Sequence, residues 1–346
     1  MASPADAIIA VTYRCNAHCA MCNIWKGRGQ DALRPEHMNK LPRGLKTINI
    51  SGGEPFLRAD LPEFVRCARD RCPGAQITIS TNGYLPDRIV QTMDRIVAID
   101  PSVRLAVSLD GIGEVHDRIR GDKGAFASVR ELLDKLRATG YRGVRLSMTL
   151  FDENLDQLEP VAELAAECGL ELGIVAAHGA LTHLGVGEPP TKLKPAWLRQ
   201  PFEMVIKRWL KRWHPRWWLR AHFAYGTYCL LAGCPRRSRC RAGRDFFFLQ
   251  ADGMVYSCSV RGEPMGNIVH RDWREIWQSP KASAARKSAE SCGEHCWMIC
   301  NARSVYRRSA LSVIAWILTN KTLAHLGLFR LPDMQQAGEA VVCEDP

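Results

Sequence analysis

Six short apolar runs with strand character alternate with helical patterns in the first half of the chain, and this alternation restricts the possible folds. The strand-like runs are residues 7–11, 47–50, 76–80, 104–108, 144–150 and 172–176. Helical patterns lie between them, at 61–72, 125–139 and 155–168, and Gly140 and Gly169 suit the C-terminal caps of the last two. Strand–helix units without a sheet-reversal signal predict parallel strands. We therefore expect an α/β fold, a partial (β/α)6 TIM-like barrel, with its chemistry on the loops that follow the strands.

Three cysteines, Cys15, Cys19 and Cys22, follow the first strand-like run closely. Three neighbouring thiolates can hold three irons of a 4Fe-4S cluster, and the fourth iron then stays open to a ligand. The same cysteines could instead bind zinc with His18, form disulfides or be buried thiols. The triplet by itself does not decide between a cluster and zinc.

A glycine pair follows the second strand-like run, in the sequence Ser51-Gly52-Gly53-Glu54-Pro55. Two glycines at a strand end allow a ligand to approach the backbone closely. The Glu54 carboxylate beside them is suited to a ligand ammonium group. A plain glycine turn is the alternative, but it is less expected at this distance from a cysteine triplet.

These two motifs resemble those of the radical S-adenosylmethionine (radical SAM) enzymes, with cysteines in the pattern C-x-x-x-C-x-x-C followed by Gly-Gly-Glu. The resemblance covers roughly residues 7–180, and strand ends at 79–83 and 106–111 and the segment 115–121 also match. Met21 departs from the family, which often has an aromatic residue before the third cysteine. This departure bears on a contact to adenine and not on the cluster.

The resemblance implies roles for individual residues. Cys15, Cys19 and Cys22 would bind the catalytic cluster, and Gly52, Gly53 and Glu54 would hold the methionine end of S-adenosylmethionine. The ribose and carboxylate would be lined by Ser80, Asn82, Ser108 and Asp110, with Arg120 as a weaker candidate. An electron from the cluster would cleave the cofactor to methionine and a 5′-deoxyadenosyl radical, which abstracts a hydrogen atom from the substrate. The protein positions and shields these groups, because the cofactor carries the hard chemistry.

A second group of cysteines lies in the other half of the chain. Residues 246–256 indicate two short strands joined by a turn at Asp252-Gly253. This part of the chain is similar to the SPASM/twitch extensions of radical SAM enzymes, which implies at least one auxiliary 4Fe-4S cluster. Its expected ligands are Cys240, Cys258 and two of Cys292, Cys296 and Cys300. Zinc is again the alternative, and the sequence assigns no role to Cys229, Cys234 or Cys343.

Acid–base groups are poorly marked in this sequence. His178 and His183 follow the sixth strand-like run and could face the substrate, although a loop histidine is more often simply solvated. Tyr228 lies near the second cysteine group and is a similar, weak candidate.

Charge and chain organisation shape the expected partners. The formal net charge is +11, which could favour anionic lipid or an acidic reductant such as flavodoxin or ferredoxin. Nucleic acid is the least expected partner, because no binding motif for it is apparent. Only fourteen residues precede Cys15, which leaves no room for an N-terminal peptide-recognition domain. We therefore expect a small-molecule or lipid substrate; the alternatives are a peptide-maturing enzyme with a separate leader-binding partner and a non-catalytic metal-binding or electron-transfer protein.

The sequence shows no evident signal peptide and no apolar run long enough to span a membrane, so we expect a cytoplasmic enzyme. A reducing compartment keeps thiols reduced, and the fourteen cysteines therefore suggest metal binding rather than disulfides. Residues 201–218 read as one helix with Trp209, Trp213 and Trp217 in a stripe among Lys and Arg, which suits either a membrane surface or packing within the protein. The expected organisation is a barrel at 1–200, a basic Trp-rich connecting helix region at 201–228, the auxiliary cluster domain at 229–303 and an apolar C-terminal helix and tail at 304–346.

Overall fold

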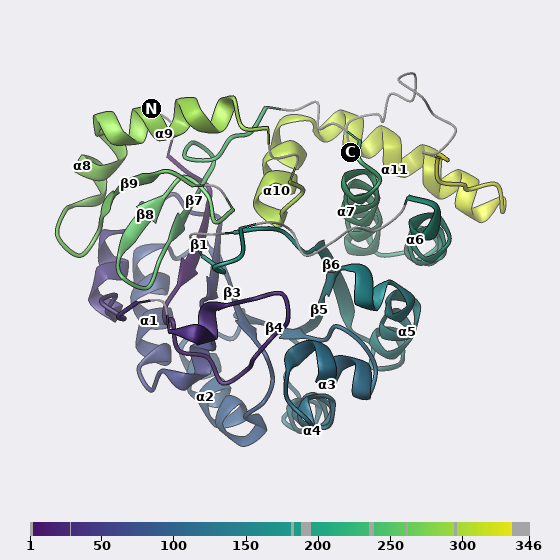
Figure 1. Cartoon of the computed structure of the whole chain (residues 1–346), viewed down its shortest axis with the longest axis horizontal. Helices are drawn as coiled ribbons and strands as arrows, with labels where there is room; N and C mark the ends of the chain where they lie inside the picture. The colour runs from purple at the N-terminus through teal and green to yellow at the C-terminus, as the bar shows by residue number, and fades with distance from the viewer. Residues whose placement is uncertain are drawn as a thin grey trace.

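The computed structural model describes residues 3–27, 29–180, 183–187, 195–234, 239–260, 262–293 and 296–333. Cys343 lies outside these residues. Six parallel strands form the predicted partial barrel (Figure 1), and they follow one another across the sheet in the order β6-β5-β4-β3-β2-β1. Their bounds are Asp6–Ala10 (β1), Thr47–Ser51 (β2), Gln76–Thr81 (β3), Arg104–Ser108 (β4), Val144–Leu150 (β5) and Glu171–Ala176 (β6).

Helices cover one face of these strands because alternate strand residues are apolar. In β3, for example, Ile77 and Ile79 join the buried core, whereas Ser80 is half-buried on the other face. Gly140 and Gly169 have φ of 76° and 67° after their helices, as expected for caps. The helices are Leu61–Arg71 (α1), Pro86–Ile99 (α2), Glu114–Arg120 (α3), Ala125–Ala138 (α4) and Leu158–Glu167 (α5), with short 3-10 helices at Ile24–Lys26, Pro35–Lys40, Pro55–Leu57 and Asp152–Gln157.

The predicted hairpin extends the same sheet. Strand β7 (Phe246–Leu249) and strand β8 (Met254–Tyr256) flank the Asp252-Gly253 turn, and β9 (Pro264–Asn267) follows. Strand β7 pairs in parallel with β1, with Phe246 opposite Asp6, so the barrel and the extension share one nine-stranded sheet. The domain boundaries proposed from the sequence stay predictions.

The expected single helix with a tryptophan stripe is wrong. Helix α6 ends at Leu210 (Pro195–Leu210), and α7 begins at Pro215 (Pro215–Leu231). Proline lacks the amide hydrogen that a helix needs and disfavours helical backbone in the residue before it; His214 is indeed extended. Trp209 is consequently buried on α6, whereas Trp213 lies in the turn with 86% of its surface exposed.

The last described helices follow the β7–β9 hairpin. They are α8 (Trp273–Gln278), α9 (Pro280–Glu290), α10 (Ile299–Arg308) and α11 (Ala310–His325). The expected C-terminal apolar segment is therefore divided between α10 and α11. Within the described ranges, no helix has both the length and the apolar character needed to cross a bilayer.

Candidate active site

The three N-terminal cysteines lie on the loop that leaves the C-terminal end of β1, and all three are half-buried. The C-terminal end of α3 holds this loop through the backbone: His18 N–H donates to Arg120 O at 3.1 Å, and Ala20 N–H donates to Ile119 O at 2.9 Å. The His18 side chain is exposed. The structure thus brings the cysteine loop and the α3 motif together.

The glycines after β2 fit against this loop. A side-chain carbon at Gly52 would overlap Thr12 O, and one at Gly53 would overlap Arg14 O. Gly53 N–H donates to Thr12 O and Glu54 N–H to Arg14 O, both at 2.8 Å. Part of the need for glycine therefore comes from the close approach of the chain's own backbone, which the sequence did not reveal.

Glu54 is buried and connects the ends of β2 and β3. Its carboxylate accepts hydrogen bonds from Phe56 N–H, from the Thr81 hydroxyl at 3.0 Å and from Asn82 N–H at 2.7 Å. Burial raises the pKa of Glu54 to about 7, although these donors oppose the shift. A carboxylate can accept about four hydrogen bonds, so capacity for a ligand ammonium is left. Asn82 also donates to Asn16 Oδ1 at 2.8 Å, within the cysteine loop.

Asp110 and Arg120 form a buried ion pair at 2.6 Å. Asp110 also accepts Thr149 N–H at 2.8 Å, and Arg120 Nη1 lies 3.7 Å from the Cys19 sulfur. Burial raises the pKa of Asp110, and the Arg120 charge opposes this shift. Asp110 Oδ1 thus accepts a hydrogen bond from β5, and Oδ2 forms the ion pair with Arg120 of α3.

The remaining candidates are less closely tied to the loop. Ser80 and Ser108 are half-buried at the ends of neighbouring strands. His178 is half-buried after β6, and burial lowers its pKa. The His183 ring lies edge-on to Phe248 of β7, with centroids 4.7 Å apart. Tyr228 is a core residue whose hydroxyl donates to Pro332 O at 2.6 Å. This hydrogen bond gives the tyrosine a structural role.

The second cysteine group surrounds one enclosed apolar cavity, which is lined by Cys240, Cys258, Cys292, Cys296 and Cys300 with Phe246, Met298 and Asn301 among its neighbours. Asn301 Nδ2 donates to the Cys296 sulfur at 3.1 Å. Burial raises the pKa of the Cys300 thiol, and Cys296 and Cys258 add to this. Thiols in an apolar enclosure fit an iron–sulfur cluster. No three His, Cys, Asp or Glu side chains of the described residues are placed to bind one common metal ion; a cluster takes each thiolate at a different iron.

Sequence reasoning missed a cation on the inner side of the barrel. Arg145 of β5 forms no hydrogen bond or ion pair with the described chain, although it stands opposite Glu171 of β6. Glu171 pairs instead with Arg220 at 3.0 Å. Burial, together with Arg220 and Arg303, lowers the pKa of Arg145 to about 9. The alternation along β5 places Arg145 on the other face of the sheet from the core residues Leu146 and Met148. This pattern was the sequence signal from which a buried cation could have been predicted.

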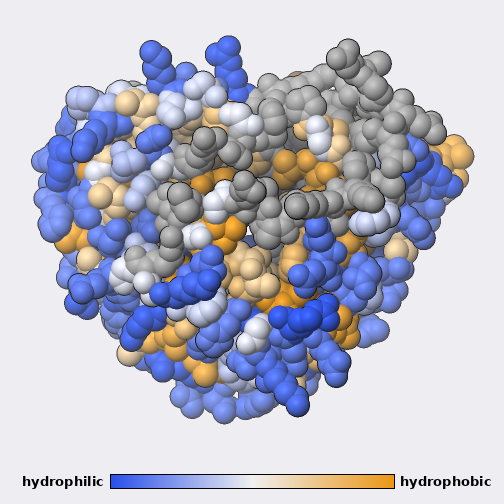
Figure 2. Space-filling model, in the orientation of Figure 1, coloured by the Kyte–Doolittle hydropathy of each residue, from blue (hydrophilic) through white to orange (hydrophobic). Residues whose placement is uncertain are grey.

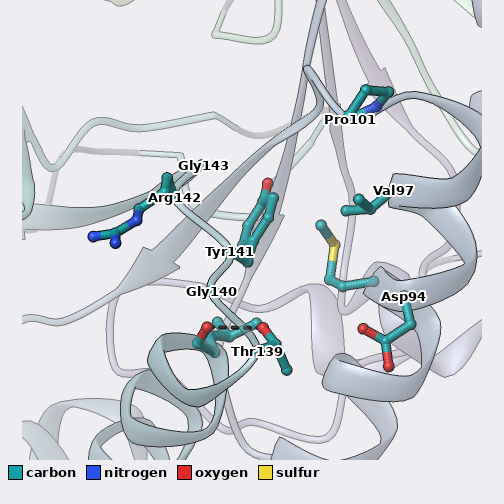
Figure 3. A pocket seen from close by; sticks show the side chains of 10 residues that line it. Asp94, Val97, Pro101, Thr139, Gly140, Tyr141, Arg142 and Gly143 are labelled. Atoms are coloured by element: carbon teal, nitrogen blue, oxygen red, sulfur yellow. Dashed lines mark hydrogen bonds between the residues drawn. The ribbon is translucent and has the colours of Figure 1, made fainter.

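A further pocket of about 430 Å³ lies at the other end of the strands (Figure 3), between α2 and the turn that precedes β5. Tyr141 points across it, and its hydroxyl contacts Val103 O. None of the predicted site residues lines this pocket.

Comparison with known proteins identifies the family. The radical SAM superfamily model matches residues 9–165, and the model of an iron–sulfur cluster-binding domain, SPASM, matches residues 240–301. The mycofactocin maturase MftC of Mycolicibacterium smegmatis is 33% identical over 296 residues, which cover 82% of this chain and 72% of MftC. The chain belongs to the radical SAM superfamily. This radical SAM protein is an enzyme whose cofactors are S-adenosylmethionine and 4Fe-4S clusters, including an auxiliary one.

Other relatives bear on the substrate class of this radical SAM enzyme. The sporulation killing factor maturation protein SkfB of Bacillus subtilis is 24% identical, over 84% of this chain and 68% of SkfB. The AdoMet-dependent heme synthase of Methanosarcina barkeri is 27% identical, over 76% of each chain. The small-molecule or lipid substrate expected from the sequence finds no support in the maturation proteins MftC and SkfB. That expectation depended on the fourteen residues before Cys15, which do not decide the matter because peptide recognition can belong to a separate protein.

Solved structures agree in fold. Streptococcus suis SuiB bound to S-adenosylmethionine has a TM-score of 0.62 at 16% identity, covering 88% of this chain and 74% of SuiB. The structure of anSMEcpe with bound AdoMet and the Cp18Cys peptide has a TM-score of 0.63 at 17% identity, covering 91% of this chain and 99% of anSMEcpe. Together they show that the radical SAM enzyme has the partial barrel and extension predicted from its sequence.

Proposed function

We propose that this radical SAM enzyme abstracts a hydrogen atom from a peptide substrate in a peptide-maturation reaction. The proposal depends mainly on the similarity to MftC, which spans both the barrel and the extension. The maturation protein SkfB supports it at lower identity.

In this proposal Cys15, Cys19 and Cys22 hold the catalytic cluster. When bound, the cluster and S-adenosylmethionine supply one electron and a carbon radical able to remove a hydrogen atom. Glu54 accepts the cofactor's ammonium group at its remaining lone pair, and Asn82 holds the loop beside it. Arg120 is held by Asp110 and donates toward the Cys19 sulfur, which keeps the loop in place.

Each hydrogen abstraction consumes one S-adenosylmethionine and one electron, and yields methionine, 5′-deoxyadenosine and a substrate radical. That radical loses one electron and one proton to give a product with two hydrogens fewer. The auxiliary cluster, which Cys240, Cys258 and two of Cys292, Cys296 and Cys300 would hold, would supply an acceptor for this second electron. The first electron comes from an acidic reductant of the flavodoxin or ferredoxin class, which the positively charged protein would attract.

Reductive cleavage of the cofactor is the first test. Anaerobically reconstituted protein with dithionite should convert S-adenosylmethionine to 5′-deoxyadenosine, and Cys19→Ala should abolish the conversion because it removes one of three cluster ligands. Cys67→Ala, a matched change at a cysteine on α1, should keep it. The absence of 5′-deoxyadenosine from wild-type protein with fully loaded clusters would rule out the catalytic assignment.

Iron content separates the two sites. A variant without Cys15, Cys19 and Cys22 should retain about four irons per chain if one auxiliary cluster is present. Removal of Cys240 and Cys258 should instead leave the catalytic cluster and the cofactor cleavage. A triple variant that holds no iron would contradict the auxiliary assignment alone.

The substrate class needs its own experiment. Short peptides encoded beside the gene, offered with S-adenosylmethionine and reductant, should show the loss of two hydrogens by mass spectrometry. The similarity to a heme synthase names the competing class. Turnover of an iron tetrapyrrole, with every such peptide unchanged, would overturn the peptide assignment and leave the radical chemistry intact.

A further inference from the structure

An apolar stripe is exposed along one side of α11. Leu311, Ile314 and Leu318 are 83%, 50% and 59% exposed, and their spacing of three and four residues places them on one side of the helix. The opposite side packs into the core through Val313 and Ile317. Apolar residues accordingly reach the surface at the right-hand edge of Figure 2, where Figure 1 places α11.

The turn between α6 and α7 continues this stripe. The Trp213 ring lies 6.4 Å from that of His325, which is seven residues, or two turns, beyond Leu318. Lys321 of α11 fixes the turn by donating to Leu210 O at 2.8 Å and to Arg212 O at 3.1 Å. The stripe and Trp213 therefore form one surface. Leu326 and Leu328, each 65% exposed, extend it past the end of α11.

Cations surround this surface, and the chain nearby lacks acids. The sequence contains no Asp or Glu between Glu203 and Asp245, nor between Glu294 and Asp333. Lys211 and Arg212 are exposed beside Trp213 and form no ion pair with any residue that the structure describes. Uncompensated positive charge next to exposed tryptophan and leucine is the combination found on helices that lie in an anionic membrane interface.

We propose that this surface, comprising the outer side of α11, residues 326–328 and the Trp213 turn, binds membranes that contain anionic phospholipid. Helix α11 then lies in the plane of the interface with Leu311, Ile314 and Leu318 among the acyl chains, while Lys211 and Arg212 contact phosphate groups. A second copy of the chain is a poorer occupant. A two-fold contact would bring the same patch of each copy together. The cations of the two copies would then lie close to one another and repel.

Vesicle co-sedimentation tests the proposal with the full chain. Wild-type protein should sediment with vesicles of phosphatidylcholine and phosphatidylglycerol and only weakly with vesicles of phosphatidylcholine alone. Added salt should weaken the binding, because it screens the cations that face the headgroups. Equal binding to the two vesicles, or no binding to either, would overturn the proposal.

Two double variants separate the apolar and the charged contributions. Leu311→Ser with Leu318→Ser should weaken binding to the anionic vesicles by more than about tenfold, because both side chains lose burial in lipid. Lys211→Gln with Arg212→Gln should weaken it about fivefold for each cation removed. The matched control, Lys281→Gln with Lys287→Gln on α9, removes the same charge from another face and should bind like wild type.

The variants also distinguish the alternatives. All four positions are exposed, so the thermal unfolding of the variants should match that of wild type. Analytical ultracentrifugation gives the competing result: a wild-type dimer that the leucine variant dissociates, without vesicle binding, would assign the surface to a second copy. A control variant as weak as Lys211→Gln with Arg212→Gln would reduce the effect to net charge and contradict the assigned surface. None of these outcomes depends on the substrate proposed above.

Discussion

The Asp110 carboxylate connects three parts of the molecule: the end of β4, the backbone of β5 through Thr149, and α3 through Arg120. The backbone of Asp110 is held by His116, whose Nδ1 accepts the Asp110 N–H at 3.0 Å. Because α3 in turn carries the backbone acceptors for the cysteine loop, one buried charge influences the position of Cys19. We therefore expect the Asp110–Arg120 pair to couple folding stability to cluster binding.

Replacing Asp110 by Asn tests this coupling. The change leaves the buried Arg120 charge without its counterion and should lower the free energy of unfolding by about 3 kcal/mol in urea titrations. The iron retained after reconstitution should fall as well. The surface pair of Asp87 with Lys135 provides the control, since Asp87→Asn should cost below about 1 kcal/mol. An Asp110→Asn protein with normal stability and normal iron content would refute the coupling.

Residue identity could be predicted from the sequence only in part. Cys15, Gly53 and Glu54 are marked by local patterns, and the structure places them on adjoining loops as expected. The partners of Glu54 and the pairing of Asp110 with Arg120 could not be predicted, because they depend on side chains that only the folded barrel brings together. Arg145 could have been noticed from the alternation of β5, but its lack of an ion pair with the described residues depends on the fold.

At the scale of elements, the ends of β1 and β2 and the N-terminus of the cysteine loop pack backbone to backbone. Gly53→Ala should therefore lower the free energy of unfolding by roughly 1–3 kcal/mol, because the added carbon needs space that Arg14 O occupies. Gly74→Ala meets no atom within 4 Å and should stay within about 0.5 kcal/mol of wild type. Equal stability of both variants, measured by urea unfolding, would show that the loop can move aside without cost.

The junction of α7, α10 and α11 predicts a pH dependence. His222 is buried between Tyr306 and Trp316, and burial lowers its pKa to about 3. The unfolded chain takes up this proton near pH 6.5, so the stability contributed by neutral His222 is present above that pH. It is lost as the pH falls toward 3, by roughly 2 kcal/mol at pH 5.

His222→Gln should reduce the difference in unfolding free energy between pH 7 and pH 5, measured on the apo protein. His270→Gln, at an exposed position, should leave that difference as in wild type. If the His222→Gln protein loses as much stability as wild type between the two pH values, the proton is taken up elsewhere.

Helix and strand positions follow from periodicity, and all six barrel strands lie where the sequence predicts them to within about one residue. The division of the Trp-rich segment into α6 and α7 was also encoded, by Pro215, but the four-residue spacing of tryptophans concealed it. The pairing of β7 with β1 had no local signal, because more than two hundred residues separate the two strands.

At the scale of the whole molecule, the nine-stranded sheet joins the barrel and the extension. The cysteine loop leaves the C-terminal end of β1, and the auxiliary cavity is lined by Phe246, which stands opposite Asp6 at the other end of β1. The two cysteine groups are thus at opposite ends of one strand pair. The exposed surface of α11 belongs to a further side of the same body (Figure 1).

The parallel register of β1 and β7 fixes the distance between the two ends of this strand pair. From Asp6 to Ala10, four rises of about 3.3 Å set a distance of roughly 13 Å between the two ends of β1. The two cysteine groups therefore cannot approach each other unless the pairing of β1 with β7 is broken. Motion of the loops alters this distance little, because its length is fixed by strand pairing.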